Sequence, residues 1–209
     1  MRPLAVLRPE PGNAATAARI EAEGMTAIRL PLFVVTPVAW RAPDPAGYDA
    51  LLITSANAIR HGGPGLDRLR DLPVFAVGEA TATAARAAGF VVEAIGKSGV
   101  TAIIARMQGK RVLHLAGRDR VEAGVDVTIV YASDPLPVDP TPLLDSIALL
   151  HSARAAARLA EIALDKHRIA IAAISPAVAE AAGPGWAALA IAGEPTDAAL
   201  IAAARDLAD

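Results

Sequence analysis

The side chains of this protein that could do chemistry follow short apolar runs, which are typical of buried strands. They are Arg8, Ser55 with Asn57, Gly78 with Thr81, Arg118, Ser152 and Ser175. Several of them also begin a predicted helix, where free backbone N–H groups and the positive end of the helix dipole attract anions. Positions of this kind bind carboxylates or phosphates with few charged side chains. The pattern therefore predicts a binding site for an anionic ligand.

Each of these residues also has a structural interpretation. Ser55 and Ser152 are ordinary N-cap residues, and capping alone accounts for them as well as ligand contact does. For Thr81, a place on the solvated surface is as good an interpretation as ligand contact. Arg118 and Arg120 could pair with Asp119 or Glu122 on the surface, where such pairs contribute about 0 to 1 kcal/mol.

Tyr131 has a different kind of position. It lies in residues 127–135, which alternate apolar and polar side chains, and residues 30–38 form an earlier β-branched run that is also bounded by prolines. Both runs fit extended strands, and each lies where one repeating pattern stops and another starts. We interpret them as two crossings between domains. A tyrosine on such a crossing faces solvent or a cleft rather than a core, so we expect Tyr131 to be functional.

The histidines and tryptophans fit structural roles better than chemical ones. His114 is predicted in a core or on a sheet face, and His151 at the end of a strand. Trp40 and Trp186 are predicted to have a packing role in the structure.

Strands and helices in alternation must position the candidate residues. The chain opens with a predicted strand over residues 3–8, a helix over 14–24 and a strand over 25–30. Asn13 is the predicted N-cap of that helix and Gly24 its stop. From residue 49 onward, buried runs alternate with helices of about ten residues, which indicates parallel βαβ units.

The second half of the chain repeats the first. Ser152 lies 97 residues after Ser55, and Ser175 lies 97 residues after Gly78, within segments of similar sequence. A third pair of segments places Thr196 opposite Thr101. These matches indicate an internal duplication of an α/β unit.

The duplication predicts a discontinuous first domain. Residues 1–33 and 136–209 are needed to complete one open parallel sheet with helices on both faces, and residues 39–126 complete the other. Residues 34–38 and 127–135 then connect the two domains. Because ligands of such sheets bind beyond the carboxyl ends of the strands, we expect a cleft between the domains to hold the site.

Composition excludes several classes of protein. The 209 residues are 54% hydrophobic and 3% aromatic, with 20 basic against 22 acidic side chains and a net charge of −2. This balance, without a basic stripe, argues against a nucleic-acid partner. No run reaches the roughly 18 apolar residues that a membrane-spanning helix needs, so we expect no membrane partner and a cytoplasmic protein. Without cysteine there is no disulfide or thiolate metal site.

The chain also lacks the local motifs of common enzymes. It has no GxGxxG, Walker, GxSxG or HExxH motif, and no cluster of residues with metal-ligand spacing. We therefore predict no metal and no cofactor. Two interpretations remain, which are a binding protein and an enzyme whose substrate brings its own reactivity. A scaffolding module fits less well, because polar residues recur at strand ends.

The order and spacing of six segments resemble the uroporphyrinogen-III synthase family over nearly the whole chain. The segments are LLITSANAIR, VFAVGEATATAARAAGF, IVYAS, ALLHSARAA, AISPAVAEAA and PTDAAL. The resemblance implies two flavodoxin-like α/β domains with parallel sheets, the first of them discontinuous, joined by a two-stranded β-ladder. It also implies an active site in the cleft and no cofactor.

The activity implied by the resemblance is that of a cofactor-independent hydro-lyase and cyclase of haem biosynthesis. Its substrate is hydroxymethylbilane, a linear tetrapyrrole, which closes to uroporphyrinogen III with loss of water and inversion of ring D. A pyrrole nitrogen expels hydroxide to form an azafulvenium cation, a spiro intermediate follows, and this intermediate fragments and recloses. The protein must supply a substrate conformation that favours the inverted closure, and a proton donor near the leaving oxygen.

The resemblance also assigns roles to individual residues. Tyr131 matches the tyrosine proposed to help the hydroxyl depart, and Thr81 matches the threonine after the Val-Gly turn. Ser55, Asn57, Ser152 and Ser175 match strand-end ligand positions of the family. The other candidates for substrate binding, from their places after strands, are Arg8, Gly78 and Arg118. We expect a monomer, because nothing in the sequence suggests an obligate interface, with transient contact to the preceding enzyme of the pathway.

Two departures from the family pattern bear on these roles. Val178 stands where many members have a threonine, so a hydroxyl contact does not carry over to that position. Between Arg120 and Gly124 the usual helix is almost wholly missing. A non-catalytic, two-lobed binding protein for a small anionic metabolite is therefore the alternative function.

Overall fold

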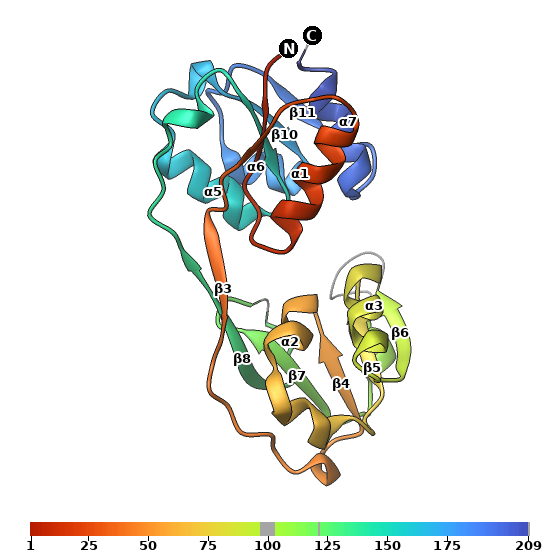
Figure 1. Cartoon of the computed structure of the whole chain (residues 1–209). Coiled ribbons are helices and arrows are strands. Elements are labelled where there is room, and N and C mark those ends of the chain that lie inside the picture. Colours follow the sequence, from red (N-terminus) through yellow and green to blue (C-terminus); the bar gives the residue numbers. More distant parts are fainter. Residues whose placement is uncertain (97–102, 121, 209) are drawn as a thin grey trace. The chain divides into compact units, whose positions relative to one another are not determined.

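The computed structural model describes residues 1–96, 103–120 and 122–208. The chain forms two compact units (Figure 1), of which unit 1 comprises Met1–Val34 with Pro135–Asp209, and unit 2 comprises Val35–Asp134. The predicted limits of a separate connecting segment, at residues 34–38 and 127–135, stay a prediction.

Unit 1 is built on a parallel sheet. Among the described residues, five strands pair in the order β11-β10-β9-β1-β2. The strands are β1 (Leu4–Val6), β2 (Ala27–Arg29), β9 (Ile147–Leu150), β10 (Ala170–Ala173) and β11 (Leu189–Ile191). The residues of β1, β9 and β10 are all fully buried, as expected for a parallel sheet that is covered on both faces.

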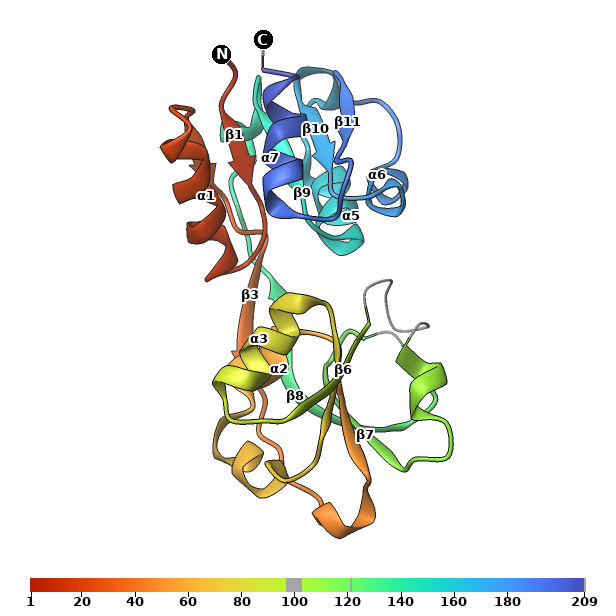
Figure 2. The same ribbon diagram turned by 90° about the vertical axis from the view of Figure 1, so that its right-hand side faces the viewer.

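Alternate strand residues of unit 1 contact helices on opposite faces of the sheet. Ala148 and Leu150 pack in the cluster of α5 (Ala153–Ile162) and α6 (Pro176–Ala182). Their neighbours Ile147 and Leu149 pack in the cluster of α1 (Gly12–Ala22) and α7 (Asp197–Arg205). Strand side chains alternate between faces, so β9 contributes to both cores. Figure 2 shows these helices around the sheet.

Helix α1 differs from its prediction at the start. It begins at Gly12, and Asn13 is buried in its first turn instead of capping it. The Asn13 Nδ2 donates to the carbonyls of Val6 (2.7 Å) and Arg8 (3.0 Å). The N-cap prediction was therefore wrong, because the side chain bonds to the end of the preceding strand. Gly24, with φ of 77°, follows the helix as the predicted stop.

Unit 2 is built on a second sheet. Among the described residues its strand order is β3-β8-β7-β4-β5-β6, and the neighbouring pairs from β8 to β6 are parallel. The strands are β3 (Phe33–Pro37), β4 (Ala50–Ile53), β5 (Val74–Val77), β6 (Val92–Gly96), β7 (Val112–Gly117) and β8 (Asp126–Pro135). β3 and β8 both pass from one unit to the other.

One face of the unit 2 sheet is covered by α2 (Ala56–His61), α3 (Glu79–Ala87) and the 3-10 helix η2 (Gly63–Leu69). Ile103, Met107 and Ala123 pack on the other face. Shorter 3-10 helices are η1 (Pro45–Gly47), η3 (Ala105–Met107), η4 (Thr141–Leu143) and η5 (Lys166–Arg168). Thr101, which the duplication places opposite Thr196, lies outside the described residues.

Two α/β domains, each with a parallel sheet, confirm the predicted fold class. Within the described ranges, no helix is long and apolar enough to cross a membrane.

Candidate functional site

The strand order of unit 1 reverses between β1 and β9. From β1 the chain steps to β2 on one side, whereas from β9 it steps to β10 and β11 on the other. Ligands of open α/β sheets bind beyond the carboxyl ends of the strands at such a reversal. Arg8 follows β1, Ser152 follows β9 and Ser175 follows β10, so the three predicted residues lie at the carboxyl edge of adjacent strands.

Asp197, which the sequence did not single out, is the centre of a charged cluster at this edge. Its Oδ1 accepts from Thr16 Oγ1 (2.9 Å) and from His151 Nε2 (2.7 Å), and its carboxylate pairs with Arg19. Arg8 Nη1 lies 3.6 Å from the same Oδ1. Burial alone would raise the pKa of Asp197, but the hydrogen bonds from His151 and Thr16 outweigh it and hold this pKa well below the ordinary value. The carboxylate therefore keeps its charge.

His151 is the strand-end histidine that the sequence predicted. Its side chain is 8% exposed, and its Nδ1 is buried without a hydrogen-bond partner among the described residues. Because an ionised carboxylate only accepts, Nε2 carries the proton that is shared with Asp197.

The strand order of unit 2 reverses in the same way, between β4 and β7. Ser55 and Asn57 follow β4, Gly78 and Thr81 follow β5, and Arg118 follows β7. Since β7, β4 and β5 are adjacent, the predicted residues of this unit also share one carboxyl edge.

Thr81 is buried, with 4% of its surface exposed, in the first turn of α3. The surface interpretation of Thr81 was therefore wrong. Gly78, which precedes α3, has φ of 80°, a conformation that strongly favours glycine.

Tyr131 lies on β8 directly opposite Gly117, the last residue of β7. A Cβ atom on Gly117 would lie 2.6 Å from Tyr131 Cζ, so the ring occupies the space that glycine leaves. The ring is half-buried, packs against the core cluster of unit 2 and has its centroid 6.5 Å from that of His61. The expectation that Tyr131 avoids a core is corrected, because one side of its ring rests on one.

Arg118 forms an ion pair with Asp134, which the sequence did not suggest, whereas Arg120 forms the suggested pair with Glu122. The Arg118 Nη1 lies 3.0 Å from Asp134 Oδ1, and the Arg120 Nη2 lies 3.0 Å from Glu122 Oε1. Arg118 is 60% exposed, so its pairing with Asp134 contributes little to stability and leaves the guanidinium accessible to an anion.

The serines at the strand ends differ in capping. Ser55 Oγ accepts from Asn57 N–H and Ser152 Oγ accepts from Ala155 N–H, each at 3.2 Å, which confirms both as N-caps. Ser175 precedes α6, but its side chain makes no capping hydrogen bond within the described part of the chain.

We expect Ser152→Ala to lower the free energy of unfolding by about 1 kcal/mol, because it removes a cap. Ser175→Ala should change it by less than about 0.5 kcal/mol. Urea unfolding of the two variants checks this difference. Equal losses would show that Ser175 also caps its helix in solution.

His114 is fully buried in β7, as predicted, and its Nε2 lies 3.0 Å from Thr54 Oγ1. Burial, helped by the charge of Arg120, lowers the pKa of His114 to about 4. The imidazole is therefore neutral at pH 7. Among the described residues, no three His, Cys, Asp or Glu side chains are grouped to hold a metal ion.

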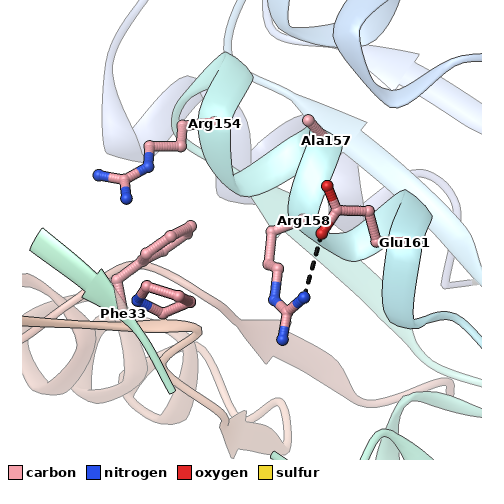
Figure 3. A pocket seen from close by; sticks show the side chains of 6 residues that line it. Phe33, Arg154, Ala157, Arg158 and Glu161 are labelled. Carbon is pink, nitrogen blue, oxygen red and sulfur yellow. Dashed lines mark hydrogen bonds and ion pairs between the residues drawn. The ribbon is translucent and has the colours of Figure 1, made fainter. Parts of the chain in front are cut away.

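A groove of about 200 Å³ lies elsewhere on unit 1, along α5 (Figure 3). Its lining residues are Phe33, Pro135, Arg154, Ala157, Arg158 and Glu161. The Arg154 guanidinium lies 4.4 Å from the centroid of the Phe33 ring, and Arg158 Nη1 donates to Glu161 (3.0 Å). None of the predicted site residues lines this groove.

Comparisons with known proteins agree with the two-domain fold. Residues 14–202 match the family model described as Uroporphyrinogen-III synthase HemD. The uroporphyrinogen-III synthetase of Helicobacter pylori 26695 superimposes with a TM-score of 0.68 at 19% identity, over 99% of this chain and 100% of that chain. A mutant uroporphyrinogen III synthase of Thermus thermophilus gives a TM-score of 0.60 at 18% identity, over 98% of each chain. No curated protein sequence matches the chain.

Proposed function

Because the chain belongs to the uroporphyrinogen-III synthase HemD family, we propose that it converts hydroxymethylbilane to uroporphyrinogen III. The reaction loses water, inverts ring D and passes through a spiro intermediate. The observation that carries this proposal is the family match over residues 14–202. The carboxyl edges that hold the candidate residues support it.

The substrate supplies the nucleophile and the electron push in this reaction, so the proposed protein groups bind, orient and move one proton. The pyrroles carry acetate and propionate side chains, and the strand-end residues suit them. Arg8 and Arg118 supply cationic groups. The other proposed binding positions are Ser55, Asn57, Gly78, Ser152 and Ser175. No cofactor takes part in the proposed chemistry.

Tyr131 is the proposed donor to the leaving hydroxyl group. A phenol O–H donates a hydrogen bond at neutral pH, and this one lies on the strand next to the carboxyl end of β7. Burial lowers the pKa of the nearby His61, and the charge of Arg60 adds to the effect, which favours the neutral form of that ring. The proposed role of Thr81, in the first turn of α3, is to support the same step.

Freshly prepared hydroxymethylbilane tests the proposal. The purified protein should accelerate its disappearance and yield the type III isomer after oxidation and separation of the products. Type I product alone, formed at the spontaneous rate, would overturn the proposed activity. Sedimentation would check the proposed monomer, which we place in the cytoplasm with transient contact to the enzyme that makes hydroxymethylbilane.

A two-lobed binding protein for a small anionic metabolite is the second candidate. Two observations favour it, namely Val178 at a position where a hydroxyl contact was expected and the short connection from Gly117 to Asp126. Among the described residues of that connection, none is helical. Saturable binding of the substrate without turnover would favour this candidate.

A further inference from the structure

Both the backbone and the side chain of Arg8 are held by contacts within unit 1. Its carbonyl accepts from Asn13 Nδ2 at 3.0 Å, and its Nη1 lies 3.6 Å from Asp197 Oδ1. Its guanidinium also rests against the first residue of α1, since a Cβ on Gly12 would lie 2.4 Å from Arg8 Nε and 2.8 Å from Arg8 Cζ. A long side chain that is fixed in this way loses less conformational freedom when it binds an anion.

Asp197 is itself fixed. Thr16, Arg19 and His151 all donate to its carboxylate, and its side chain is 16% exposed. A carboxylate with this many donors cannot turn away from Arg8 without losing several hydrogen bonds. It therefore acts as a rigid anchor for the guanidinium.

Two guanidinium groups, of Arg8 and Arg19, lie beside the one carboxylate of Asp197. Glu10, an acidic side chain just before α1, pairs with Arg29. Arg8 is 36% exposed and Arg19 57% exposed, so an incoming carboxylate can approach both.

We infer that Asp197 and Gly12 are positioning residues that hold the Arg8 guanidinium ready for a carboxylate of the substrate. Asp197 acts by its charge and Gly12 by the space it leaves. The class of ligand rests on the proposed function, whereas the positioning of Arg8 rests on contacts within unit 1.

Gly12→Ala tests the position of the Arg8 guanidinium without changing any charge. The added methyl group displaces the end of a flexible side chain, while the helix gains a residue of higher helix propensity. Gly47→Ala is the matched control, because a Cβ there meets no described atom within 4 Å. Arg8→Gln removes the cation altogether, and Asp197→Asn removes the anchoring charge at constant size.

Binding of a porphyrin octacarboxylate, followed by its fluorescence, is the readout that needs no turnover. We expect Arg8→Gln to weaken binding about tenfold, because a charge-assisted hydrogen bond is lost. Gly12→Ala and Asp197→Asn should weaken it by about threefold or more and raise KM for hydroxymethylbilane more than they lower kcat. In the Arg8→Gln background, Gly12→Ala should have no further effect.

The outcomes separate this inference from the proposed function. Arg8-dependent and Gly12-dependent binding by a protein that forms no type III isomer would support the inference and reject the synthase. If the protein forms the type III isomer but Gly12→Ala binds the porphyrin as tightly as Gly47→Ala does, the synthase is supported and the inference is rejected. The inference would also be overturned if Gly12→Ala weakened porphyrin binding equally with and without Arg8. It would be overturned as well if the wild type showed no saturable porphyrin binding. Thermal unfolding of each variant shows that it is folded.

Discussion

Replacing Tyr131 by Phe is expected to lower kcat for hydroxymethylbilane about 100-fold or more, the effect of losing a positioned proton donor. The substitution removes one oxygen from a ring that rests over Gly117 and leaves its packing intact. The free energy of unfolding should therefore change by about 1 kcal/mol or less. Single-turnover rates with fresh substrate, paired with urea unfolding, measure both quantities.

The chain contains its own control, because it has two tyrosines. Tyr48 lies away from the strand-end residues and its hydroxyl is 3.3 Å from Asp126 Oδ2, so Tyr48→Phe should leave kcat unchanged. Gly117→Ala keeps the Tyr131 hydroxyl but pushes the ring from its place, and it should lower kcat as well. A Tyr131→Phe variant with the wild-type rate would remove Tyr131 from the mechanism.

Acidification from pH 6.5 to pH 4 is expected to lower the free energy of unfolding by about 3 kcal/mol through His114 alone. The pKa of His114 is about 4 in the folded protein, and an exposed histidine in the unfolded chain has an ordinary value near 6.5. Between these values the unfolded state binds the proton and the folded state does not. The contribution of His114 to stability is therefore full above pH 6.5 and falls as the pH drops toward 4.

Urea unfolding at several pH values measures how the free energy of unfolding depends on pH. His114→Asn should reduce this pH dependence, and His61, whose pKa is also lowered by burial, should account for part of what is left. His167→Asn, which removes an exposed imidazole, is the matched control and should retain the full dependence. The lowered pKa of Asp197 acts in a different window, because that carboxylate contributes stability above the ordinary carboxyl range and loses it only in stronger acid. A flat profile for the wild type between pH 6.5 and 4 would show that folded His114 accepts a proton.

The fold could be predicted because local sequence patterns and the internal duplication both indicate it. Buried runs between helices indicate parallel strands, and the repeat of Ser55 and Gly78 at Ser152 and Ser175 indicates two copies. These patterns also placed the candidate residues at strand ends. All of them lie at the carboxyl edges of their sheets, apart from Tyr131 on its crossing strand.

Contacts between distant elements could not be predicted in the same way. Asp197 on α7 binds His151, which follows β9, and nothing in the residues around either indicates the other. Asn13 has the residue type of a cap but bonds to the carbonyls of a neighbouring strand end. Thr81 has a polar side chain at a helix start, where exposure on the surface fitted it as well as ligand contact did, yet it is buried.

Two glycines were missed for a physical reason. Gly12 and Gly117 have ordinary backbone angles, so neither is required by a turn. Each leaves space for the side chain of a proposed site residue, Arg8 beside Gly12 and Tyr131 beside Gly117. A glycine that makes room for a neighbouring side chain can be recognised only when the tertiary contact is known.

The isomer composition of the product tests the proposed function most directly. With hydroxymethylbilane held constant and the protein concentration raised, the type III fraction should rise from near zero toward one. The Tyr131→Phe variant should need much more protein to reach the same fraction. Product that stays type I at every concentration of wild-type protein would contradict the assignment of this chain as a working uroporphyrinogen-III synthase.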